Sequence, residues 1–203
     1  MKKVAKFLGV LLLLGVAANA IKSINGSPIS ANAVSSDGQT TNVSARPMPK
    51  DEAAFVRAVQ KAQADDKTAA NDMQKGGVRA SRENELCKML GALNAANWVG
   101  DVYSISSNSD GKGVLAITVA PGVYIQTWNN AFSDIADSTL IEPNSPTFTK
   151  ASQLKEGQQV KFSGTFFRDA EDTVGCLKEG SLTLDGKLSE PEFIFRFSDV
   201  AAI

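Results

Sequence analysis

A dense group of aromatic, amide and carboxylate side chains lies in the second half of the chain. It comprises Trp128, Asn129, Asn130, Asp134 and Asp137. The indole offers a large apolar surface, while the amides and carboxylates supply hydrogen-bond donors and acceptors. These residues fall in a long connection without helical or strand periodicity, and such connections are often functional on compact domains. We therefore predict a ligand-binding site at these five residues.

The acidic residues of this group have two further interpretations. With Ser133, Thr139 and Glu142, the carboxylates of Asp134 and Asp137 could surround a hard cation, but their spacing does not match an EF-hand loop. In the second interpretation, Ser133 caps a short helix whose first turns contain both aspartates. We favour capping over a cation site, and we predict no metal.

Tyr124 extends the candidate site onto the preceding segment, which has the alternation of a strand. At period two, Tyr124 and Trp128 lie on the face opposite Val123 and Ile125. Exposed aromatic rings can stack on a ligand, whereas a helix packed over them would shield them from solvent. We favour coverage by the helical region Phe55–Leu93, with ligand stacking as the alternative.

Catalytic constellations are missing from the sequence. It contains no histidine, which removes the commonest general base and the most frequent zinc ligand. It has neither a nucleophile elbow nor a Cys-x-x-Cys pair, and Gly111-Lys112-Gly113 lacks the spacing of a phosphate-binding loop. We therefore expect a protein that is not an enzyme and needs no cofactor.

The first 20 residues have the features of an export signal. Three lysines precede a leucine-rich apolar run, and Ala18-Asn19-Ala20 has the small-x-small form of a cleavage site. The run is shorter than the roughly 20 apolar residues that a spanning helix prefers. We therefore predict a signal peptide over residues 1–20 and a periplasmic or secreted protein. The alternative is an inner-membrane anchor over residues 4–20, which would be the protein's one link to the membrane.

The charge distribution argues against a nucleic-acid partner. The 203 residues carry a formal net charge of −1, but residues 97–203 contain 14 acidic and 8 basic side chains, a net charge of −6. Binding to a phosphate backbone requires clustered lysine and arginine side chains. We expect the partner to be a small ligand or another protein of the cell envelope.

The two cysteines, Cys87 and Cys176, predict a disulfide. An exported protein folds in an oxidising compartment, where an even pair of cysteines usually forms a bond. A loop of this length predicts a stabilisation of about 4–5 kcal/mol in the chain-entropy model. This bond would join a helical region to the second half of the chain.

Two regions separate the export signal from the strands. Residues 21–48 are rich in Ser, Asn, Ala, Gly and Pro, a composition that predicts a flexible linker. Residues 49–96 predict a helical arm, because apolar residues recur at helical spacing after Pro49. Gly76-Gly77 should break this arm, and a second helix should run from Arg79 or Ser81 to Leu93.

From residue 97 the apolar pattern changes to the period of strands. Three strands, an irregular insert and two further strands are expected, with Gly100 as a bulge and Gly164 as a bulge or a sharp bend of the barrel. This order, together with Gly157, Val160 and Gly164 around the fourth strand, resembles the OB-fold of exported bacterial domains. The resemblance covers residues 97–203 and implies an α+β protein, with the helical arm followed by a five-stranded OB-like β-barrel.

The resemblance also implies a binding function. We expect a non-catalytic binding or accessory protein of the bacterial cell envelope, with an unidentified ligand. A single-stranded nucleic-acid-binding OB protein is one alternative, by analogy of fold. A hydrolase that uses carboxylates is the other, and it would require two carboxylates with raised pKa values in one pocket.

Overall fold

The structure is a computed structural model that describes residues 47–170 and 172–203. The predicted signal peptide at residues 1–20, the alternative anchor at residues 4–20 and most of the predicted linker lie outside the described residues. The helical arm and the strands belong to one unit of the chain.

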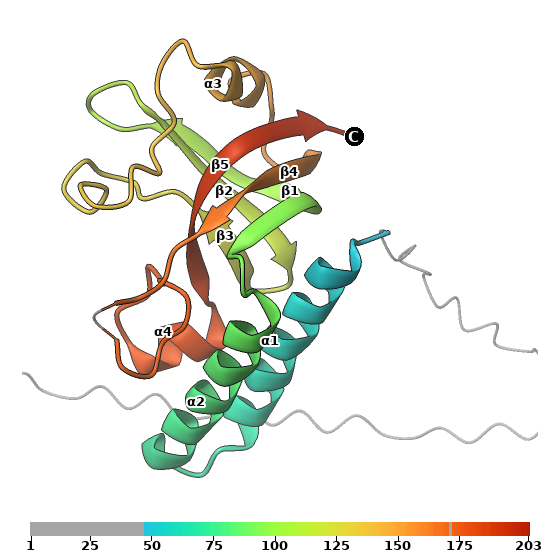
Figure 1. Ribbon diagram of the computed structural model, residues 1–203, viewed down its shortest axis with the longest axis vertical. Helices are drawn as coiled ribbons and strands as arrows, with labels where there is room; N and C mark the ends of the chain where they lie inside the picture. The colour runs from blue at the N-terminus through green and yellow to red at the C-terminus, as the bar shows by residue number, and fades with distance from the viewer. Residues whose placement is uncertain (1–46, 171) are drawn as a thin grey trace, which may run out of the picture. The chain divides into compact units, whose positions relative to one another are not determined.

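Five strands form a closed barrel in the order β1-β2-β3-β5-β4, and β4 pairs back with β1. The strands are β1 (Asn94–Ser107), β2 (Gly113–Ala120), β3 (Val123–Gln126), β4 (Gln159–Phe166) and β5 (Glu192–Ala202). Neighbouring strands are antiparallel except β3 and β5, which run parallel. The predicted α+β fold, a helical arm followed by a five-stranded OB-like barrel, is confirmed (Figure 1).

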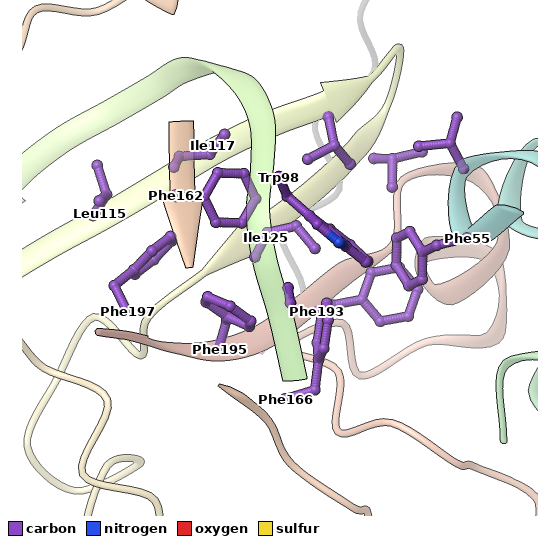
Figure 2. Close-up of a cluster of buried hydrophobic side chains, with 14 of the residues drawn as sticks. Phe55, Trp98, Leu115, Ile117, Ile125, Phe162, Phe166, Phe193, Phe195 and Phe197 are labelled. Carbon is purple, nitrogen blue, oxygen red and sulfur yellow. The ribbon is translucent and has the colours of Figure 1, made fainter. Parts of the chain in front are cut away.

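Alternate strand positions fill the barrel interior, as the period-two pattern predicts. The alternating apolar residues of strands β2 to β5 are buried: Leu115, Ile117, Val119, Val123, Ile125, Val160, Phe162, Phe166, Phe193, Phe195 and Phe197. Phe195 packs edge to face against Phe162 and Phe197, with ring centroids 5.7 and 5.0 Å apart (Figure 2). Such aromatic pairs add about 0.5–1.5 kcal/mol beyond the burial of their area.

Two strand glycines had been predicted as bulges, with different outcomes. The register between β4 and β5 shifts between Ser163 and Gly164, so the bulge at Gly164 is confirmed. A Cβ at this position would overlap the carbonyl oxygen of Arg196. The bulge predicted at Gly100 is wrong. The pairing of β1 with β4 shifts between Ala95 and Trp98, and its pairing with β2 shifts between Val102 and Ser104, so neither shift falls at Gly100. Gly100 instead allows close approach, since a Cβ there would overlap the Ile117 side chain of β2.

The helical arm is a pair of helices, α1 (Lys50–Thr68) and α2 (Asp72–Met89). The predicted break at Gly76-Gly77 is wrong, because both glycines lie inside α2. The break falls instead before Asn71, whose side chain caps α2 by accepting the amide of Gln74 at 3.0 Å. Each helical glycine costs about 1 kcal/mol relative to alanine. The cap and the packing of α2 against α1 outweigh that cost.

The arm closes one end of the barrel. Phe55 of α1 is fully buried, and its ring centroid lies 5.1 Å from Trp98, 5.6 Å from Phe166 and 5.0 Å from Phe193 (Figure 2). Carboxylates at the start of α1 add polar contacts, since Trp98 Nε1 donates to Asp51 at 2.9 Å. The amide of Val99 likewise donates to Glu52 at 2.9 Å. The arm is therefore part of the barrel's core.

The predicted disulfide joins Cys87 of α2 to Cys176, which follows β4, with Cα atoms 5.5 Å apart. Two short helices complete the described part of the chain: α3 (Pro146–Ala151) and α4 (Leu184–Ser189). In Figure 1, α4 lies at the same end of the barrel as the arm, and α3 lies at the opposite end. The outer face of β1, β2 and β3 lies between these ends and carries the candidate site.

Candidate ligand-binding groove

A groove of about 510 Å³ lies on the outer face of the barrel. Strands β1, β2 and β3 form its floor, and segments 127–133 and 180–182 border it together with the start of β5. Its lining residues are Ser104, Ser106, Val114, Leu115, Ala116, Gln126, Thr127, Trp128, Asn129, Ser133, Gly180, Leu182 and Glu192. OB barrels bind their ligands on this face. Of the predicted site residues, Trp128 and Asn129 line the groove.

Trp128 is held in the groove wall from two sides. Its indole Nε1 donates to Asp137 Oδ2 at 2.8 Å, and its backbone amide donates to the hydroxyl of Thr139 at 2.8 Å. Asp137 is buried and also accepts two bonds from Lys178 Nζ, each at 2.9 Å. The ring therefore keeps one orientation, and its apolar face is the part available to a ligand.

Asp134 is buried behind this wall. Its Oδ1 accepts the amide of Thr139 at 2.5 Å and the Thr139 hydroxyl at 2.7 Å, while Oδ2 accepts the amide of Leu140 at 3.1 Å. Through Thr139, Asp134 supports the backbone of Trp128. The predicted site acids Asp134 and Asp137 therefore hold the aromatic wall in place, and their oxygens are already engaged within the protein.

Asn130 has a local role in the same connection. Its Oδ1 accepts the amide of Ser133 at 2.9 Å, and its Nδ2 donates to Asn129 Oδ1 at 2.7 Å. Ser133 had been predicted as the capping residue, but here Asn130 is the acceptor and the segment forms turns instead of a helix. Ser133 lines the groove, and its hydroxyl accepts Asn130 Nδ2 at 3.1 Å.

Tyr124 lies on the same outer face but beside the groove. Its ring pairs with Tyr103 of β1 at a centroid distance of 4.6 Å, and Tyr103 is 57% exposed. Burial, and then the neighbouring Tyr103, raise the pKa of Tyr124 above its ordinary value. The contacts of the arm described above lie at the barrel end, at Trp98, Phe166 and Phe193, and not on Tyr124 or Trp128.

The groove carries little charge. Among its lining residues the one ionisable side chain is Glu192, whose Oε2 accepts Gln126 Nε2 at 3.0 Å. The hydroxyls of Ser104 and Ser106 have no hydrogen-bond partner among the described residues. The groove thus combines a fixed aromatic ring with hydroxyl and amide groups, and it lacks the paired carboxylates of a hydrolytic site.

Gln126 and Glu192 are groove residues that the sequence analysis did not nominate. Gln126 shares the face of Tyr124 and Trp128 at period two, so its alternation was a usable signal. Glu192 reaches this face because β5 pairs in parallel with β3. That pairing depends on how the barrel closes, and no local pattern around Glu192 indicates it.

The comparisons with known proteins give no family for this chain. No protein-family model, curated protein or solved structure matches it. Across residues 47–170 and 172–203, no group of three or more Cys, Asp or Glu side chains is placed to hold a metal ion. Within the same residues, no helix combines the length and apolar character needed to cross a membrane.

Proposed function

We propose that this protein is a non-catalytic binding or accessory protein of the bacterial cell envelope. In this proposal, its ligand occupies the groove on the outer face of β1, β2 and β3. One observation carries the proposal: Trp128 is fixed by Asp137 and Thr139 in the wall of a groove of about 510 Å³. A preformed pocket with an aromatic wall and few polar groups is typical of small-ligand sites.

Location in the envelope is supported by two features of the chain. The first 20 residues have the pattern of a cleaved export signal, and in this proposal they direct the protein to the periplasm or out of the cell. The disulfide between Cys87 and Cys176 fits an oxidising compartment. The OB-like barrel adds a type of scaffold whose strand face and loops bind ligands.

The groove favours this proposal over the two alternatives. A single-stranded nucleic acid needs basic side chains along its backbone, and the lining residues include neither lysine nor arginine. A hydrolase of the carboxylate type needs two acids on either side of the bond to be cleaved, and Glu192 is the one acid among those residues.

The test uses the mature protein and the low-molecular-weight fraction of an envelope extract. Saturation-transfer NMR detects small molecules that bind, and Trp128→Ala should abolish their signals. Phe132→Ala is the matched control, because Phe132 lies in the same connection, is 85% exposed and is not among the lining residues. Fluorescence of the buried Trp98 verifies that each variant is folded. Signals that persist in Trp128→Ala, or no signals from the wild-type protein, would contradict the proposal.

A further inference from the structure

We infer that the groove binds an uncharged, hydroxyl-rich ligand, an oligosaccharide; this deepens the proposed function and rests on it. The inference starts from Trp128. Its indole N–H is already donated to Asp137 at 2.8 Å, so the residue can contact a ligand through the apolar face of its ring. A sugar ring has an apolar C–H face of matching size, and burying the two faces against each other removes both from water.

The polar groups of the groove match the edges of such a ring. The hydroxyls of Ser104 and Ser106 have no partner in the described part of the chain and can each donate and accept. Asn129 and Ser133 also line the groove beside Trp128. Asn130 Nδ2 donates to Asn129 Oδ1 at 2.7 Å and to Ser133 Oγ at 3.1 Å, so the Asn129 amide and the Ser133 hydroxyl keep their hydrogens for donation to a ligand. Groups that both donate and accept suit sugar hydroxyls, which do the same. A site for a charged ligand would instead present several groups of the opposite charge.

The charge of the groove excludes an anionic ligand and does not favour a cationic one. A phosphate or carboxylate would meet Glu192 and no cation among the lining residues. A cation would find one carboxylate, and Oε2 of that carboxylate already accepts Gln126 Nε2 at 3.0 Å. An uncharged ligand avoids both costs. OB barrels offer a scaffold for oligosaccharides on this face.

The experiment compares oligomers that differ in charge. Titration calorimetry measures the binding of cellotetraose and N-acetylglucosamine tetramer, both neutral, to the mature protein. The cationic glucosamine tetramer, the anionic galacturonate tetramer and a single-stranded thymidine octamer are the charged probes. We expect a neutral tetramer to bind at least about tenfold more tightly than any charged probe. Loss of stacking in Trp128→Ala should weaken that binding at least about tenfold, while Phe132→Ala stays within about twofold.

Failure of this inference can be told apart from failure of the proposed function. If a charged probe binds most tightly and Trp128→Ala abolishes its binding, the groove is a ligand site but its class is wrong. If neither neutral tetramer binds, the inference is overturned, and the extract experiment alone then decides whether the groove has another ligand. Tight binding of a neutral tetramer that Trp128→Ala leaves unchanged would place the sugar elsewhere and also overturn the inference.

Discussion

The junction between α2 and the barrel and the groove on the outer face use polar residues in opposite ways. At the junction, the guanidinium of Arg82 is buried and donates to Glu83 Oε1 and, at 2.7 Å, to Glu179 Oε1. In the groove, the hydroxyls of Ser104 and Ser106 have no hydrogen-bond partner among the described residues. The buried charges of the junction therefore serve the structure of the protein, whereas a few available hydroxyls beside a fixed ring mark the candidate site.

The junction is linked from several directions. Glu83 Oε2 accepts the amide of Cys176 at 2.6 Å, which is next to the disulfide. Arg82 also donates to the backbone carbonyl of Lys187 and lies 5.5 Å from the ring centroid of Phe193. A buried ion network of this kind adds little net stability over an apolar core, but removing one member leaves charges buried without a partner.

The largest expected effect follows from removing the centre of this network. Arg82→Ala leaves Glu83 and Glu179 buried without their cation and should lower the free energy of unfolding by about 3–5 kcal/mol. Urea unfolding followed by circular dichroism measures the change. Arg57→Ala is the matched control, because Arg57 is exposed on α1 and should change stability by less than about 0.5 kcal/mol. A loss below about 1 kcal/mol for Arg82→Ala would show that the charged residues of the junction do not stabilise the fold, and the contrast with the groove would fail.

Glu179 makes the junction sensitive to pH. Its side chain is 1% exposed and its Oε2 has no hydrogen-bond partner in the described structure. Burial therefore raises its pKa from 4.5 to about 7, and Arg82 opposes this rise in part. The folded protein therefore binds a proton at Glu179 more tightly than the unfolded chain does. The stability that this protonation contributes is fully present below pH 4.5 and is lost as pH rises through about 7.

The second prediction separates this titration from the rest of the molecule. In Glu179→Gln the position no longer titrates, so the decline in stability between about pH 5 and 7.5 should be smaller than in the wild-type protein. The difference between the two curves should be on the order of 2–3 kcal/mol across this range. Urea unfolding at closely spaced pH values gives both curves. Parallel curves would mean that Glu179 titrates in the folded protein as it does in the unfolded chain.

The two regions also differ in how far the sequence predicts them. The barrel follows from period-two alternation and from Gly164, because these features act within each strand. The break of the arm was misplaced at Gly76-Gly77, since a local cost of about 1 kcal/mol per glycine is smaller than the packing of α2. Asp134 and Asp137 lie in the same connection as Trp128, but the sequence does not show that their carboxylates bond within the protein, because that depends on how the connection folds back on Thr139 and Lys178.

Predicting the groove residues from the sequence would also require knowing which strands pair in the barrel. Trp128 and Asn129 could be nominated from their chemistry, whereas Glu192 joins them through the parallel pairing of β3 with β5. Ser104 and Ser106 resemble many other serines in the chain until the barrel places them beside Trp128. Asp134 and Asp137, which support Trp128 from behind, could therefore be nominated from the sequence, whereas the lining residues Ser104, Ser106 and Glu192 could not.

The smallest expected effect tests the groove through a residue that does not line it. Asp137→Ala removes the acceptor of the Trp128 indole and the partner of Lys178, which should cost about 1 kcal/mol of stability. Because the ring then loses its fixed orientation, affinity for the groove's ligand should fall several-fold, less than in Trp128→Ala. Phe132→Ala, at an exposed position of the same connection that is not among the lining residues, should leave affinity within about twofold.

Asp137→Asn gives the discriminating result. Its amide oxygen can still accept the Trp128 N–H, but the variant lacks the charge that pairs with Lys178. If Asp137 acts by positioning the ring, Asp137→Asn should recover most of the affinity lost in Asp137→Ala, although its stability stays reduced. Equal loss of affinity in both variants would instead make Asp137 a direct ligand contact through its charge. Unchanged affinity in Asp137→Ala would mean that the orientation of Trp128 does not depend on this hydrogen bond. The proposal that Asp137 fixes Trp128 as a preformed wall of the groove would then be wrong.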